Sequence, residues 1–148
     1  MPQSEQVLNV FVASRNTGAV FTRVFGSDRR WTAAVGVFFD SFGTRGGGVG
    51  RQARLTHLVR NDCGGYYLHV GSAWRHLVAG QGVLRYRGWP DSNVADNFVD
   101  TSDFAAGSAD HFGVEGLWSH GAVSSLGEVV VARADAPASG RPVFRGFT

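Results

Sequence analysis

The stretch Tyr66-Tyr67-Leu68-His69-Val70-Gly71-Ser72-Ala73-Trp74-Arg75-His76-Leu77-Val78 decides how the rest of the chain is interpreted. Its first residues alternate with a period of two, which predicts a strand over 66–70. Gly71-Ser72 is expected to break that strand. Trp74, Leu77 and Val78 then follow at i, i+3 and i+4, which predicts a short helix over 73–79 with Trp74 in the core. This order places His69 at the rim of a sheet, where a histidine and backbone donors suit a polyhydroxylated ligand.

Length and composition favour one all-β domain. The chain has 148 residues, 43% of them hydrophobic, and 21 glycines between short β-branched and aromatic runs. A chain of this size buries a full core as a single domain, expected over residues 1–148. Its net charge of +2 comes from arginine without any lysine. That charge is too small, and too dispersed, to indicate a nucleic-acid partner.

The compartment is inferred from what the sequence lacks. Cys63 is the only cysteine, so no internal disulfide forms, which fits a reducing compartment. The first residues carry neither the basic nor the apolar segment of a signal peptide. No apolar run approaches the roughly 18 residues of a membrane helix. The expected location is therefore the cytoplasm.

Other strands are predicted by the same alternation of apolar and polar residues. They are expected over residues 7–12, 19–25, 31–39, 52–60 and 82–87, and in a hairpin formed by 111–118 and 126–132. The glycine-rich segment 40–50 lacks the Gly-Lys-Ser/Thr ending of a phosphate loop. Two interpretations stay open for it, a hairpin connection or a sugar-binding loop whose backbone N–H groups a ligand can approach.

Segment 93–106 carries Asp96, Asp100 and Asp103 and is expected to contain one or two helical turns within 95–105. Paired carboxylates occur in glycosidases, but a solvated acidic face explains this spacing more simply. Trp89, in a loop, either stacks on a sugar or caps the core. His69 and His76 do not have metal-ligand spacing, so no metal site is expected.

Three segments resemble the fungal fruit-body lectin family. His69, Trp74 and Leu77-Val78 match its His-Asn-Tyr-x-x-Trp-x-x-hydrophobic-hydrophobic segment, with Val70 and Gly71 in place of Asn and Tyr. The run from Phe21 to Trp31 is similar to the family's opening strands. The hairpin of 111–118 and 126–132 is similar to its closing pair.

The resemblance implies an all-β, actinoporin-like β-sandwich with one or two short helices. Its core would span 7–132. Residues 134–148 run past the end of that family, and an irregular or edge-docking extension is expected there, because Val143, Phe144 and Phe147 are too apolar for a free tail. The resemblance also implies a lectin without catalytic activity or cofactor, which binds galactose/GalNAc-type glycans such as Galβ1-3GalNAc. The carbohydrate site would consist of His69, Gly48, Val49, Ala34, Val70 and Gly71. A possible second site would consist of His76, Leu77, Ala79 and Trp89.

The expected partners are glycans and glycoconjugates, with membranes reached only through glycans. Because one sugar site binds weakly, a homo-oligomer, dimer or tetramer, is expected to add avidity. Two other classes were weighed. A membrane-binding cytolysin of the same fold needs an amphipathic N-terminal helix, for which the strand expected from Val7 leaves no room. A hydrolase using His57, Asp62 or the aspartate cluster would lack any Gly-x-Ser-x-Gly elbow.

Overall fold

The structure is a computed structural model, which describes residues 17–40, 48–62, 65–88, 99–138 and 140–147. All regular elements in this part of the chain are strands. They are β1 (Thr17–Phe25), β2 (Trp31–Asp40), β3 (Gly48–Asp62), β4 (Tyr66–Ala79), β5 (Val83–Leu84), β6 (Arg87–Gly88), β7 (Val99–Asp100), β8 (Phe104–Ala105), β9 (Ser108–His120), β10 (Val123–Asp135) and β11 (Val143–Phe147). The all-β prediction is confirmed.

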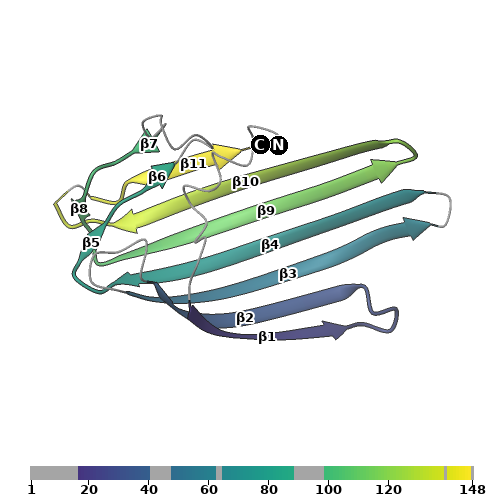
Figure 1. Ribbon diagram of the computed structural model, residues 1–148, viewed down its shortest axis with the longest axis horizontal. Coiled ribbons are helices and arrows are strands. Elements are labelled where there is room, and N and C mark those ends of the chain that lie inside the picture. The colour runs from purple at the N-terminus through teal and green to yellow at the C-terminus, as the bar shows by residue number, and fades with distance from the viewer. Residues whose placement is uncertain (1–16, 41–47, 63–64, 89–98, 139, 148) are drawn as a thin grey trace.

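One large antiparallel sheet contains most of these strands, in the order β1-β2-β3-β4-β9-β10-β11 (Figure 1). Two small sheets, β5-β8 and β6-β7, account for the others. Strands β3, β4, β9 and β10 have 15, 14, 13 and 13 residues, about twice the usual length of 5–6. A sheet edge is formed by β1 on one side and by β11 on the other.

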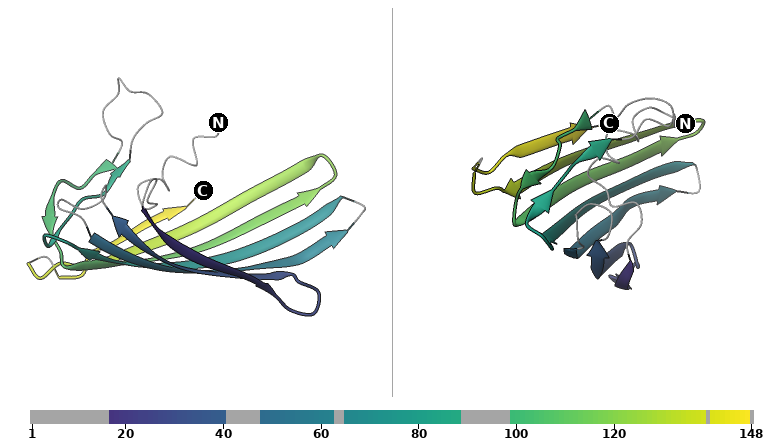
Figure 2. Two further views of the ribbon diagram at one scale, coloured as in Figure 1. Left: turned by 60° about the horizontal axis from the view of Figure 1, so that its bottom comes forward. Right: turned by 60° about the vertical axis from the view of Figure 1, so that its left-hand side comes forward.

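The connections at the two ends of the sheet differ in length. At one end, Gly26–Arg30 joins β1 to β2 and Gly121-Ala122 joins β9 to β10, and β3 turns into β4 there as well. Gly26, Gly65 and Gly121 all have positive φ, which glycine adopts without strain. The opposite end carries β5 to β8, which lie in the described residues 80–88 and 99–107 of segment 80–107 and fold back over the sheet (Figure 2).

The buried core lies at this second end and consists of small side chains. Leu77 and Ala79 from β4, Ala109 from β9 and Ala134 from β10 pack against Leu84 and Ala106 of the folded-back segment. Among the described residues, no large side chain is less than 2% exposed. The core therefore covers one end of one sheet face.

The short helix predicted over 73–79 is wrong. β4 continues without interruption from Tyr66 to Ala79, because β3 and β9 pair with it along its whole length and satisfy its backbone groups on both sides. Gly71 and Ser72 pair within this ladder, so they do not break the strand. The helical turns expected within 95–105 are also absent where this range is described, since β7 and β8 lie there. Residues 95–98 lie outside the described residues.

The other predicted strands over 19–25, 31–39, 52–60 and 66–70 are confirmed, as is the hairpin of 111–118 and 126–132. The predicted strand over 82–87 is split into β5 and β6. Within the range 134–148, Val143–Phe147 form β11, which pairs with β10 at the sheet edge, while Ala134 and Asp135 belong to β10 itself. The strand expected over 7–12, and most of the glycine-rich segment, lie outside the described residues.

Candidate functional site

Strand pairing sorts the side chains of the large sheet onto two faces. Residues directly opposite each other share a face, so the face of each residue follows from the register. We call the face with Leu77, Ala109 and Ala134 the inner face, because segment 80–107 packs against it. The face with Val70, Trp74 and the residues paired with them is the outer face. The sheet curves around the side on which β5 to β8 lie (Figure 2).

The outer face carries most of the exposed large hydrophobic side chains of the described residues. Its exposed large hydrophobic side chains come from all seven strands of the sheet. They are Phe21, Phe25, Val35, Val37, Phe39, Val49, Leu55, Val70, Trp74, Val78, Phe112, Val114, Trp118, Val123, Val129, Val143 and Phe147. Phe147 is 79% exposed, Phe21 68% and Phe39 64%. A soluble monomer seldom exposes so continuous an apolar surface.

Aromatic side chains gather on the outer face at the end with the short turns. Phe25 stacks on Trp31, with ring centroids 6.2 Å apart, and Trp31 stacks on His57 at 4.0 Å. Further along the same end, Tyr66 meets Trp118 edge to face at 6.5 Å. These rings combine an apolar body with a polar atom, a combination that suits a boundary between apolar and aqueous surroundings.

Polar side chains lie on the outer face toward the other end. Arg51, His76, Asp110 and Arg133 are in register across β3, β4, β9 and β10. Asp110 Oδ1 accepts a hydrogen bond from Trp74 Nε1 at 3.1 Å and lies 3.0 Å from His76 Nδ1. On β10, the residues from Val123 to Val131 separate the two ends, a stretch of about nine residues or roughly 26 Å.

The inner face is polar in its middle. Arg54 forms an ion pair with Glu115, and Glu128 lies directly opposite Glu115. Burial raises the pKa of the Glu128 carboxyl, the neighbouring Glu115 raises it further, and Arg54 opposes the shift. Gly71, the cross-strand partner of Glu115, leaves room for this group, since a Cβ there would lie 2.6 Å from Glu115 Oε1.

Segment 80–107 covers one end of the inner face through Tyr86. The Tyr86 hydroxyl lies 3.1 Å from Nε2 of the buried His111, and its ring packs 5.1 Å from that of Phe144. Burial raises the pKa of the Tyr86 phenol to about 12. Within the segment, Arg85 forms hydrogen bonds to both carboxylate oxygens of Asp100, and this contact raises the pKa of the guanidinium. The segment is thereby fixed against the sheet.

The residues predicted to bind carbohydrate are spread over both faces. His69, Gly71 and Ala34 are on the inner face, where the half-buried His69 stacks on Tyr67 with ring centroids 6.4 Å apart. Val70 and Val49 are on the outer face. Gly48 pairs with Ala79, while His69 pairs with Leu58, which places Gly48 and His69 toward opposite ends of β4, about 30 Å apart. The structure brings His69 and Gly71 together, but not the set.

The second predicted site is divided in the same way. His76 is on the outer face, bonded to Asp110, while Leu77 and Ala79 are buried in the core. Trp89 lies outside the described residues. Trp74, expected in the core, is 37% exposed on the outer face, because β4 alternates there and does not turn into a helix.

The residues that a hydrolase would have used make ring contacts and ion pairs instead. His57 stacks on Trp31, Asp62 forms an ion pair with Arg60, and Asp100 and Asp103 lie within ion-pair distance of Arg85. The described parts of the chain contain no group of three or more His, Cys, Asp or Glu side chains arranged to hold a metal ion. Nor do these parts contain a helix long and apolar enough to cross a membrane.

Sequence reasoning missed the outer face as a surface. The alternation over 31–39, with Ala33, Val35, Val37 and Phe39 on one parity, was visible in the sequence. In a soluble sheet the apolar side of a strand usually faces the core, so this pattern alone does not indicate an exposed apolar face. The signal that could have distinguished the two is the inner-face series Gly71, Gly113, Gly36 and Gly50, which is too small to fill a core.

No protein-family model, no curated protein and no solved structure matches this chain.

Proposed function

We propose that this sheet is part of a membrane wall, with its outer face against lipid acyl chains and its inner face lining a water-filled passage. The observation that carries the proposal is the set of exposed large hydrophobic side chains on the outer face, which come from all seven strands, whereas the middle of the inner face carries Arg54, Glu115 and Glu128. The passage would carry small polar solutes. It would be narrowed at one end by segment 80–107.

The exposed area supports a lipid contact over an aqueous one. A phenylalanine side chain offers on the order of 200 Å², so the exposed parts of Phe21, Phe39 and Phe147 alone amount to about 400 Å². The largest apolar patch of an ordinary monomer is about 300–600 Å² in total. The aliphatic side chains between these rings add further area. At about 25 cal/mol per Å², leaving this face in water is costly.

The dimensions also fit a bilayer. A strand that crosses hydrocarbon at a tilt of about 45° needs about 9–11 residues, and the apolar outer stretches of β2 and β10 have about nine each. Aromatic side chains border the outer-face hydrophobics at the end with the short turns. At the other end, the polar row of Arg51, His76, Asp110 and Arg133 crosses β3, β4, β9 and β10, with Val49 and Val78 one step beyond it. Trp and Tyr gather at membrane–water boundaries for the same reason.

The edges set a condition on this proposal. Backbone groups must be hydrogen-bonded inside hydrocarbon, and β1 and β11 each pair on one side only among the described strands. Both would therefore pair with further strands in the membrane. Arg23 and Arg145 lie on the outer parity of these two strands, and their long side chains would have to extend along the surface to reach water.

The test is insertion into phospholipid vesicles, followed by flotation and by release of a small trapped polar dye. We expect the protein to float with the vesicles, and its tryptophan fluorescence to be quenched by lipids brominated within the acyl chains. The dye should leak. A protein that stays in the aqueous fraction as a discrete complex, with the outer face buried against another protein, would refute the membrane wall.

Carbohydrate binding is the second candidate, and the observation that favours it is the stacking of Tyr67 on His69, both half-buried on the inner face. An aromatic ring beside an imidazole can stack on a sugar and hydrogen-bond its hydroxyls. Under this proposal the actinoporin-like sandwich, the galactose/GalNAc-type ligand and the oligomer also stay predictions. Binding to a glycan array that free sugar reverses would support it.

A further inference from the structure

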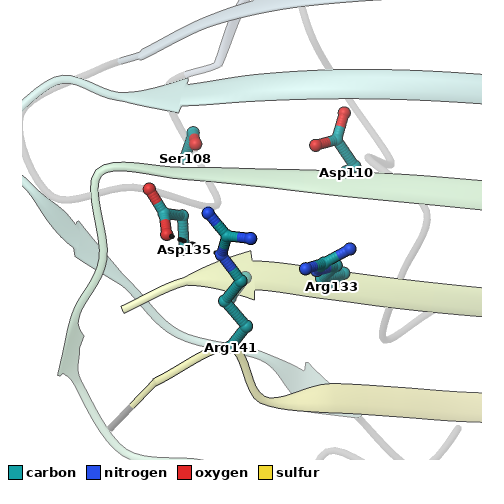
Figure 3. Close-up of a pocket in the computed structure, with 6 residues that line it drawn as sticks. Ser108, Asp110, Arg133, Asp135 and Arg141 are labelled. Atoms are coloured by element: carbon teal, nitrogen blue, oxygen red, sulfur yellow. Dashed lines mark ion pairs between the residues drawn. The ribbon is translucent and has the colours of Figure 1, made fainter. Parts of the chain in front are cut away.

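A polar hollow of about 260 Å³ lies at the end of β9 and β10, bordered by Ser108, Asp110, Arg133, Ala134, Asp135 and Arg141. Ser108 pairs with Asp135 and Asp110 pairs with Arg133 across the two strands. Figure 3 shows Arg141 reaching from the β10–β11 connection toward Asp135. Its volume is close to the lower end of the range for small-molecule sites, about 300–1,000 Å³, so a small group would fill it.

The position of the hollow follows from the face on which it lies. Asp110, Arg133, Ser108 and Asp135 all have outer-face parity. On β10, Arg133 is the first polar residue after the apolar stretch that ends at Val131. The hollow therefore borders the apolar zone. If the outer face contacts acyl chains, this border is the depth of the lipid head groups.

The hollow contains both acidic and basic side chains, and they differ in how many polar contacts they already make. Asp110 already accepts from Trp74 and lies within hydrogen-bond distance of His76. Arg141 Nε lies 3.5 Å from Asp135 Oδ1, beyond a normal hydrogen bond, and both side chains are more than 60% exposed. Among the described residues, Arg133 has no carboxylate within ion-pair distance. The hollow thus offers the guanidinium groups of Arg133 and of the loosely paired Arg141 for an anion, and the carboxylate of Asp135 for a cation.

We infer that this hollow holds the head group of a phosphatidylethanolamine, an inference that rests on the proposed membrane wall. Arg133 and Arg141 would donate to the phosphate oxygens, since a guanidinium presents paired N–H groups that match them. Asp135 would accept from the ammonium, which has three N–H donors. The quaternary ammonium of phosphatidylcholine has no N–H, and phosphatidylglycerol has no cation. Neither would use both halves of the hollow.

The experiment measures lipid selectivity of the inserted protein. The protein is placed in vesicles of phosphatidylcholine that contain a small fraction of spin-labelled phosphatidylethanolamine or, separately, spin-labelled phosphatidylglycerol. We expect a motionally restricted component that is several-fold larger for phosphatidylethanolamine. Arg133→Gln and Asp135→Asn should each reduce it to the phosphatidylglycerol level. Arg23→Gln, on the outer parity of the opposite edge strand β1, is the matched control and should leave it unchanged.

The outcomes separate this inference from the proposed function. Insertion with equal restriction of both lipids, or with selectivity that survives Arg133→Gln and Asp135→Asn, overturns the head-group site and leaves the membrane wall standing. A protein that does not insert overturns both. Displacement of the labelled lipid by millimolar glycerophosphoethanolamine would show that the head group alone suffices, and would overturn the claim that the ligand is a membrane lipid.

Discussion

A matched pair of substitutions on β10 tests whether the outer face meets lipid. Val129 is 52% exposed on the outer face and Leu126 is 61% exposed on the inner face. They are three residues apart on the same strand, both aliphatic, and both near the middle of the apolar stretch from Val123 to Val131. Replacing each of them by arginine exchanges an aliphatic side chain for a charged one at nearly the same depth in the proposed membrane. Only the face differs.

The expected magnitudes follow from the two environments. An arginine facing hydrocarbon near the bilayer centre costs about 2–4 kcal/mol, which lowers the folding equilibrium constant by about 30-fold or more. An arginine facing water at an exposed position changes stability by about 0.5 kcal/mol or less. Val129→Arg should therefore destabilise the inserted protein strongly, and Leu126→Arg should not.

The assay is urea-induced unfolding of the vesicle-inserted proteins, followed by tryptophan fluorescence. The midpoint of Val129→Arg should fall well below that of the parent, while Leu126→Arg stays close to it. Equal midpoints for the two variants would mean that both faces are wet, and the membrane wall would be wrong. A larger loss for Leu126→Arg would mean that a partner covers the inner face.

Three further predictions concern single groups. The raised pKa of Tyr86, about 12, lies above its unfolded value near 10, so the unfolding free energy should fall by about 2 kcal/mol between pH 10 and pH 12. A Tyr86→Phe protein in the same denaturant titrations should lose this dependence. Since the pKa of Glu128 is also raised, its charge destabilises the fold above that pKa, so Glu128→Gln should raise the urea midpoint at pH 7 and leave it unchanged at pH 3. If the inner-face pair of Tyr67 and His69 binds sugar, His69→Ala should lower the affinity for glycans on an array by up to about tenfold. The melting temperature should not change. A lower melting temperature with unchanged glycan binding would mean that His69 is a structural residue.

The strands were largely predictable because their pattern is local. The two-residue period over 19–25, 31–39 and 126–132 predicts a strand in each segment, and each segment is a strand. Short turns were marked by glycines such as Gly26 and Gly65, which adopt positive φ. The helix predicted over 73–79 failed because Trp74 faces outward and Leu77 inward, so that both parities are apolar and the period of two disappears.

The candidate site was less predictable. Grouping His69 with Val49 and Gly48 assumed a break after Val70, whereas the uninterrupted strand carries them far apart and onto different faces. The polar row of Arg51, His76, Asp110 and Arg133 is drawn from four strands, and no spacing along the chain indicates it. The register shift between Leu58 and Arg60 changes which parity faces outward, and a single inserted residue of this kind leaves no clear sequence signal.

Local patterns along the chain were enough to predict the all-β class and the positions of most strands, because these properties depend on neighbours within a few residues. Which face of the sheet is covered depends instead on packing between segments that are distant in the sequence. That choice depends on where segment 80–107 packs, and its contacts through Leu84, Tyr86 and Ala106 place it on the side of the small and polar residues. The outer face, with its larger apolar side chains, stays exposed because the described covering segment packs on the inner face.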